Sequence, residues 1–200
     1  MHILLLIISL DFSCGDIRVM TLDANSTVWS FETWGRPYRL ISPLLDCSSP
    51  ETTPIQIQCD SSFSAVFMGS GDVYAWQARL SGYEEAMATF DQDESTRAIV
   101  PDGGTVIPCH TWEMNVNPVK LPIPPDLPDL PMTGLSEEER RKETRFIKIA
   151  TFANGLVGLT NKGHVCLLEV WFYLRPAPGG VSFGIWRYVS ENARMIGTPS

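Results

Sequence analysis

The chain has 200 residues, of which 44% are hydrophobic and 19% charged, and its formal net charge is −8. These values predict a folded chain rather than a disordered one, and six tryptophans and nine phenylalanines favour β-sheet. The acidic charge repels phosphate backbones, so we expect no nucleic-acid partner.

The first ten residues are apolar and share only some features of a secretory signal. The run from Ile3 to Leu10 has no Lys or Arg before it, and no small-x-small cleavage site follows before Asp11. It is also too short to span a bilayer as a helix. We therefore expect it to belong to the fold of an intracellular protein that does not contact a membrane.

A 22-residue pattern occurs three times without an internal gap, at residues 10–31, 55–76 and 147–168. Each copy opens with apolar residues that alternate with polar or small ones, which is typical of a half-buried strand. A second apolar pair, a polar turn and a third strand opening on valine follow, so the predicted unit is a strand, a short connection and a hairpin. The alternating residues are Leu10/Phe12/Cys14, Ile55/Ile57/Cys59 and Ile147/Ile149/Thr151, the second pairs are Met20/Leu22, Ala65/Phe67 and Val157/Leu159, and the valines are Val28, Val73 and Val165.

The hairpin turns differ in one residue that matters for the backbone. In the third copy Gly163 is free to take a positive φ in the tight turn. The first copy has Ser26 at the matching position, and we expect its neighbour Asn25 to take the positive φ instead.

A fourth element also recurs, as "RPYRL" at 36–40 and "NPVKL" at 117–121. Its proline suits the start of an outer or edge strand, where no ladder donor is needed. The valines that open the third strands lie 45 and then 92 residues apart, whereas a four-stranded propeller blade takes about 40–50 residues. The longer interval fits one blade with an insertion or two blades of which one has decayed. The late position of "NPVKL" favours the insertion.

The sequence therefore predicts an all-β fold, an incomplete β-propeller of about three to four blades with a long proline-rich insertion. Residues 1–76 would form two blades, and residues 143–200 the third repeat and C-terminal strands. Residues 77–142 would be the insertion. It would contain an acidic loop or short helix at 80–97, an extended proline-rich linker at 118–131 and the start of a short helix over 136–145, capped by Ser136 and Glu139. A partial ring leaves sheets open at both ends, so we expect either a longer protein or self-association through open blade edges.

No pattern of reactive side chains indicates catalysis, a cofactor or a metal. The five cysteines are odd in number and show no CxxC spacing, so we expect reduced thiols without a disulfide framework or zinc site. We expect His164 to be a surface turn residue, and Cys109 and His110 to point to opposite sides of an extended chain. The acidic residues lack the spacing of a calcium loop, and four tryptophans off the repeat pattern fit either partner binding or packing between blades. These acidic residues are Glu84, Glu85, Asp91, Asp93 and Glu94, and these tryptophans are Trp34, Trp112, Trp171 and Trp186.

The three copies resemble the regulator-of-chromosome-condensation repeat. The matching stretches are "SCGDIRVMTLDANSTVWSF", "IQCDSSFSAVFMGSGDVYAW" and "IKIATFANGLVGLTNKGHV". The histidine usual in that repeat is replaced by Arg18, Phe63 and Gly155, and its terminal Trp-Gly survives only as Trp76 followed by Gln77. Such degenerate copies with a long insertion look most like fungal F-box proteins of the SCF-associated-factor type. That resemblance implies a propeller that recognises substrates for a ubiquitin ligase, and because this chain carries no F-box sequence it would supply only the recognition part.

The function expected from the sequence is a non-catalytic protein–protein interaction module. One alternative is guanine-nucleotide exchange or chromatin association, as implied by the wider family, and another is a secreted lectin-like or carbohydrate-active propeller, which cleavage of residues 1–10 would indicate. Specificity should come from the part that is not repeated, residues 77–142, because loops on a rigid scaffold commonly carry recognition. Deletion of residues 80–133 would then abolish partner capture, unless the insertion is only a spacer.

Overall fold

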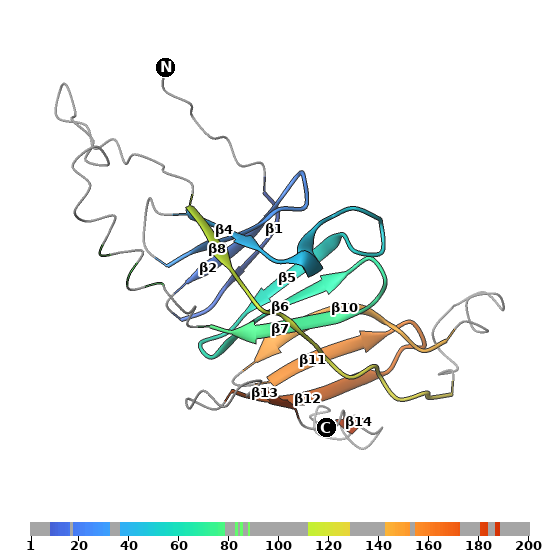
Figure 1. Cartoon of the computed structure of the whole chain (residues 1–200). Coiled ribbons are helices and arrows are strands. Elements are labelled where there is room, and N and C mark those ends of the chain that lie inside the picture. The colour runs from blue at the N-terminus through green and yellow to red at the C-terminus, as the bar shows by residue number, and fades with distance from the viewer. Residues whose placement is uncertain are drawn as a thin grey trace, which may run out of the picture.

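The computed structural model describes residues 9–16, 18–32, 37–78, 83, 85, 88, 112–128, 143–152, 155–172, 181–183 and 187–188. These residues form three sheets, arranged one after another in chain order (Figure 1). The first sheet contains β1 (Ser9–Cys14), β2 (Val19–Asp23), β3 (Val28–Phe31), β4 (Pro37–Ile41) and β8 (Trp112–Asn115). The second contains β5 (Pro54–Cys59), β6 (Phe63–Met68), β7 (Val73–Gln77) and β9 (Val119–Lys120). The third contains β10 (Phe146–Phe152), β11 (Gly155–Thr160), β12 (Val165–Phe172), β13 (Val181–Phe183) and β14 (Arg187–Tyr188), and a 3-10 turn, η1 (Pro43–Leu45), follows β4.

The predicted repeat is present in all three sheets. Each begins with a strand and a hairpin, and the third strands open on Val28, Val73 and Val165 as expected. A register shift recurs at the same repeat position, at Leu10, Ile55 and Ile147, between the flanking pairs Ser9/Asp11, Pro54/Gln56 and Phe146/Lys148. Such bulges re-aim side chains, and all three of these apolar residues are exposed.

The sheets pack face to face, which makes each of them a blade. The first strand β5 lies between the first strands β1 and β10, while β8 and β9 are the outermost strands of their sheets. Successive antiparallel sheets stacked in this way form part of a β-propeller. The fold of the described residues is thus nearly all β, with residues 83, 85 and 88 helical, and it is an incomplete propeller of three blades.

Two apolar cores hold the blades together. The first lies between the first and second sheets and includes Met20, Leu22, Tyr38, Ile57 and Trp76. The second lies between the second and third sheets and includes Phe63, Phe67, Phe146, Ile149 and Leu168. The second and third sheets therefore each bury one face against the sheet before them.

Polar side chains on the first strand of one blade accept backbone N–H groups from the first strand of the next blade. Asp11 and Ser13 of β1 accept the backbone N–H groups of Ile57 and Cys59, both at 2.9 Å. The matching residues of β5, Gln56 and Gln58, accept those of β10 residues Ile149 at 3.0 Å and Thr151 at 3.3 Å. This inter-blade ladder satisfies N–H groups that the edge strands cannot pair within their own sheets.

The ladder stops at the third blade. Its matching positions are Lys148 and Ala150. An ammonium group has three donors and no acceptor, and alanine has neither. These two side chains therefore cannot accept N–H groups from a further strand as the equivalent residues of β1 and β5 do.

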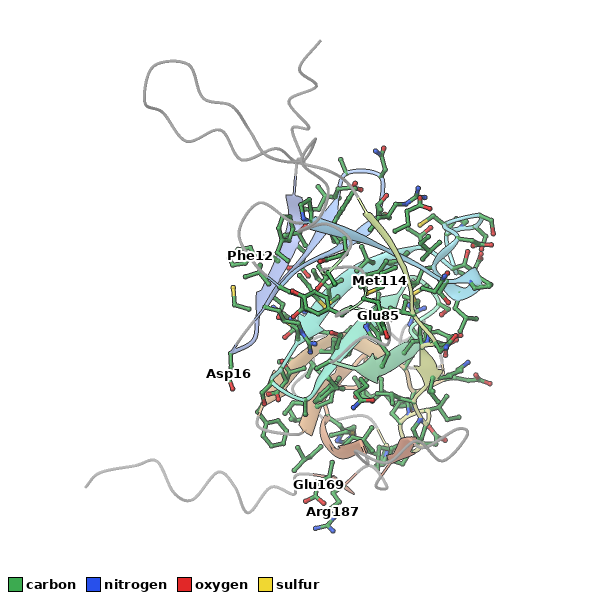
Figure 2. The ribbon with its side chains drawn as sticks, turned by 60° about the vertical axis from the view of Figure 1, so that its left-hand side comes forward. Phe12, Asp16, Glu85, Met114, Glu169 and Arg187 are labelled. Atoms are coloured by element: carbon green, nitrogen blue, oxygen red, sulfur yellow. The ribbon has the colours of Figure 1, made fainter. Side chains whose placement is uncertain are left out.

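The first blade exposes the face that the other blades bury. Phe12 is 68% exposed, whereas its counterparts Ile57 and Ile149 are fully or almost fully buried. Figure 2 shows Phe12 projecting from β1 at the side of the molecule. Its backbone N–H donates to the neighbouring Asp11 carboxylate at 3.0 Å rather than to a preceding blade.

The prediction for the first hairpin turn is wrong. Ser26, not Asn25, has the positive φ, 59°, and it matches Gly71 at 91° and Gly163 at 85°. The Asp23 carboxylate accepts the N–H groups of Asn25 and Thr27, at 2.8 and 2.9 Å, and so holds the turn in the geometry of the other two. The turn contacts outweigh the backbone preference of serine.

The described part of the segment expected to be an insertion contributes strands. Residues 112–128, here called the belt, run along the outer side of the blades (Figure 1). β8 pairs with β4 of the first sheet, and β9 pairs with β7 of the second in the outer-strand place expected for "NPVKL". Met114, Val116 and Leu121 of the belt are buried in the two cores. In the acidic stretch, residues 83, 85 and 88 are helical, as one of the two predicted alternatives requires, and the rest of the stretch lies outside the described residues. Of the helix expected over 136–145, residues 136–142 lie outside the described residues and 143–145 are not helical.

Candidate interaction surface

The belt is tied to every blade by a polar contact. On the first blade, Arg39 and Glu113 form an ion pair at 3.1 Å, with both side chains exposed. On the second, Lys120 pairs with Asp72 at 2.7 Å, and the backbone N–H of Leu121 donates to the carbonyl of Val73 at 2.8 Å. The Asp72 carboxylate raises the pKa of Lys120, so this lysine is held in its charged form.

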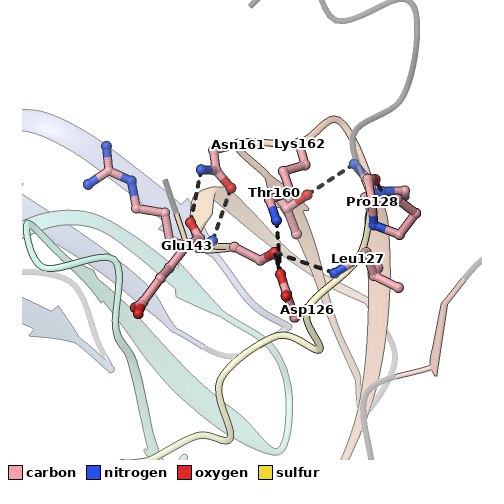
Figure 3. A network of polar contacts seen from close by, with 10 residues as sticks. Asp126, Leu127, Pro128, Glu143, Thr160, Asn161 and Lys162 are labelled. Carbon is pink, nitrogen blue, oxygen red and sulfur yellow. Dashed lines mark hydrogen bonds and ion pairs between the residues drawn. The ribbon is translucent and has the colours of Figure 1, made fainter. Parts of the chain in front are cut away.

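On the third blade, the hairpin turn of residues 160–164 anchors the end of the belt (Figure 3). Lys162 Nζ lies 2.8 Å from Asp126 Oδ1, and the Thr144 hydroxyl donates to the same oxygen at 2.7 Å. The hydrogen bond from Lys162, followed by that from the Thr144 hydroxyl and the charge of Lys162, lowers the pKa of Asp126. The lysine side chain is only 11% exposed, so its ammonium is largely covered by the belt that it holds.

His164 is not the surface residue that the sequence predicts. It is 2% exposed, and its Nε2 makes a short hydrogen bond with the backbone carbonyl of Pro128. Its backbone N–H donates to the Thr160 hydroxyl at 3.0 Å. The residue is covered because the proline-rich segment, which is distant in sequence, lies across the turn.

The same turn fixes the start of β10. The Asn161 side chain accepts the backbone N–H of Arg145 at 3.0 Å and donates to the carbonyl of Glu143 at 3.1 Å. The Asn161 N–H donates in turn to the Arg145 carbonyl at 2.9 Å. One turn thus orients both the belt and the segment that enters the third blade.

A groove of about 210 Å³ opens beside this segment, at the junction of the second and third blades. Its lining is more apolar than polar and includes the bulged residues Ile55 and Ile147, and Arg145 is its one charged residue. Ligand pockets for whole small molecules are usually larger, about 300–1,000 Å³. The groove therefore suits one or two apolar side chains of a partner. Its remaining lining residues are Phe67, Gly69, Gly71 and Phe146.

A buried arginine joins the first two blades. Arg18, 3% exposed, donates to the carbonyl oxygens of Asp60 and Phe63 in the second blade at 2.8 and 2.7 Å. Burial lowers the pKa of Arg18, and the nearby charge of Glu32 opposes that shift. The sequence marks Arg18 only as a departure from the usual histidine, so this contact between blades was not predicted.

Most of the other acidic, tryptophan, cysteine, histidine and serine residues singled out in the sequence lie outside the described residues. Glu85 is exposed, while the other four acidic residues named above, Cys109, His110 and Ser136 lie outside the described residues. Trp112 and Trp171 lie in β8 and β12, and Trp34 and Trp186 lie outside the described residues. Of the four cysteines described, Cys59 and Cys166 are buried, Cys47 is half-buried and Cys14 is exposed.

Among the described residues, no three His, Cys, Asp or Glu side chains gather where they could hold a metal ion. Within the same part of the chain, no helix has the length and apolarity needed to cross a membrane.

Comparisons with known proteins give similarity at the level of structure. No family model matches the sequence, and no curated protein matches it. The crystal structure of Prp20p from Saccharomyces cerevisiae is similar at 17% identity over 78% of this chain and 31% of that chain, with a TM-score of 0.39. The structure of Kap60 bound to yeast RCC1 (Prp20) gives 16% identity over 78% and 30%, with a TM-score of 0.41. Human WBSCR16 gives 14% identity over 93% and 39%, with a TM-score of 0.44. The chain therefore spans about a third of the length of the structures that it matches.

Proposed function

We propose that the chain is the binding part of a propeller of the regulator-of-chromosome-condensation type, and that it is a non-catalytic module for protein recognition. The observation that carries this proposal is the apolar groove between the second and third blades, which is bordered by Arg145 and set on a rigid scaffold. The partner would insert an apolar side chain between Ile55 and Ile147 and place a carboxylate near Arg145. The inter-blade ladder and the turn of residues 160–164 supply the rigidity that such recognition needs.

At a finer level, we propose that the captured protein is a substrate presented to an SCF-type ubiquitin ligase. This rests on the resemblance of the degenerate repeats to fungal F-box proteins. Co-purification of a cullin with the full-length parent protein is the outcome expected, and its absence would remove the ligase assignment while leaving the binding function.

The experiment on the groove compares partner capture by three variants of the full chain. Ile147→Asp and Arg145→Glu alter exposed residues of the groove and should each reduce recovered partner at least tenfold. Ser61→Glu, an exposed change in the β5–β6 turn at the opposite end of β6, is the matched control and should leave capture unchanged. Equal capture by all variants, at unchanged melting temperature, would overturn the proposal.

A second candidate is a basic partner bound by general charge attraction, which the net charge of −8 favours. The Prp20p structure is described together with that protein's binding to Gsp1p and histones. Such binding would weaken steeply as salt rises and would be insensitive to Ile147→Asp. Capture through the groove should show the reverse behaviour.

A further inference from the structure

Burial along the belt repeats every three residues from 121 to 128. Leu121 and Pro124 are buried and Leu127 is half-buried, whereas the residues between them are exposed. A three-residue period is that of the polyproline II helix, which has three residues per turn. Four of the eight residues are prolines, whose rings fix φ near the value of that helix. The burial period and the prolines therefore fit a polyproline II helix with one edge packed on the protein.

Contacts at both ends hold this helix in place. Lys120, next to its first residue, pairs with Asp72 of the second blade, and Asp126 pairs with Lys162 of the third. The backbone N–H groups of Leu121 and Leu127 donate outside the segment, to the Val73 carbonyl at 2.8 Å and the Thr144 hydroxyl at 3.5 Å. A polyproline II helix has no internal hydrogen bonds, so such outside contacts are what order it.

The other two edges of the helix face solvent. One consists of Pro122, Pro125 and Pro128, which follow each other at intervals of one turn, and all three are exposed. They span roughly 19 Å at about 3.1 Å per residue. The other edge presents Ile123, which at 72% is the most exposed of the large hydrophobic residues described. Three proline rings on one edge and an isoleucine on the next, here called the ridge, are thus exposed side by side.

We propose that this ridge is a docking site for a small domain that reads polyproline II helices through an aromatic-lined groove, of the SH3 or WW kind. Such domains take proline-rich segments spaced as here, and they exploit a helix whose ordering costs little entropy on binding. In this chain the ordering is complete before the partner arrives, because both ends are fixed to blades. The only charged residue within the segment, Asp126, is paired with Lys162, so the ridge suits an uncharged aromatic groove.

This surface goes beyond the groove proposed above and does not depend on it. The groove accepts a partner's side chain, whereas the ridge offers its own. The two can therefore be separated by substitution, and failure of one leaves the other standing.

The test uses the folded full chain as ligand and a panel of purified, isotope-labelled SH3 and WW domains as probes, followed by NMR titration. At least one domain should bind with shifts centred on its groove aromatics. The double variant Pro122→Ala/Pro125→Ala should weaken that binding at least tenfold. Pro50→Ala, an exposed proline outside the belt, and Ile147→Asp in the groove should leave it unchanged.

A second readout addresses the ordering of the helix. Asp126→Asn removes the ion pair with Lys162 but keeps every proline, and it should weaken binding several-fold because the ridge must then be ordered by the partner. Circular dichroism melts establish that each variant is folded. Absence of binding by every domain of the panel at 1 mM chain (on the order of the weakest specific affinities), or binding that the double proline variant leaves intact, would overturn the proposal.

Discussion

Ser26 holds a backbone conformation that glycine adopts in the other two blades. The left-handed conformation costs an L-residue roughly 1–2 kcal/mol. Replacement by glycine removes this strain, but glycine loses more conformational entropy on folding, which costs about 0.5–1 kcal/mol. We expect Ser26→Gly to raise the free energy of unfolding by about 0.5–1 kcal/mol in urea denaturation. Gly163→Ala, the reverse change at the matching position, should lower it by about 1 kcal/mol or more. A destabilised Ser26→Gly variant would show that the serine side chain has a role that outweighs the backbone cost.

Arg18 illustrates how a single residue can change its role within a repeat. Its guanidinium reaches two carbonyl groups of the neighbouring blade from a buried position. A buried cation is tolerated only where acceptors replace its water, and here they belong to a different sheet. The replacement of the usual histidine was visible in the sequence, but the acceptors were not, because backbone carbonyls of a distant turn leave no mark in the residue pattern.

At the scale of elements, the end of the belt should respond to pH through Asp126. Lys162 and Thr144 lower the pKa of this carboxylate in the folded protein. Where folding lowers the pKa of a carboxylate, the ionised group stabilises the folded state at pH values above the unfolded pKa, which is near 3.9 for aspartate. This stabilisation is lost as the pH falls through the folded pKa. We therefore expect the belt to stay docked at neutral pH and to loosen below about pH 4.

Hydrogen exchange measures this loosening at the Leu127 amide, after correction for the intrinsic rate at each pH. The amide of Ala78, which donates to the backbone carbonyl of Ser62 at 2.9 Å and not to a titratable side chain, is the internal control. In the Asp126→Asn variant, the Leu127 amide should exchange faster than in the wild type at pH 7. Its corrected exchange rate should show no further rise between pH 5 and 3. A wild-type Leu127 amide that exchanges equally slowly throughout this range would contradict the role given to Asp126.

The strands were predictable because their information is local. Alternation over five or six residues and a valine after each polar turn located nine strands of the three copies. The bulges at Leu10, Ile55 and Ile147 were not visible, since an extra residue in one strand is defined only by its partner strand. The docking of the belt, and with it the burial of His164, depends on residues some 36 positions apart in sequence. A proline-rich composition suggests an extended chain, but it does not say which surface that chain will cover.

At the scale of the whole molecule, the open side of the first blade should govern self-association. Leu10 and Phe12 are exposed there, and Lys148 and Ala150 give the third blade no acceptors with which a second copy could continue the ladder. Association would then rest on apolar contact alone. Burying a phenylalanine contributes about 1.5–3 kcal/mol, so Phe12→Ser should raise the dissociation constant about 10- to 100-fold.

Analytical ultracentrifugation over a range of concentrations measures this change. Phe152→Ser, which alters another exposed phenylalanine at the end of β10, is the matched control and should behave as the wild type. If the Phe12→Ser chain associates as strongly as the wild type, the contact lies elsewhere on the molecule.

The belt also has a consequence for how the chain is made. Glu113 follows its partner Arg39 by 74 residues. A ribosome adds about 5–20 residues per second, so the outer edge of β4 waits roughly 4–15 s for the strand that covers it. During that interval the nascent first blade presents a row of unpaired backbone groups, of the kind that recruits strands from other chains. Pro37, which has no donor, and the charged Arg39 both lie on that edge strand, where such residues discourage wrong pairing. Translation that stalls before residue 112 would leave this edge open for as long as the pause lasts.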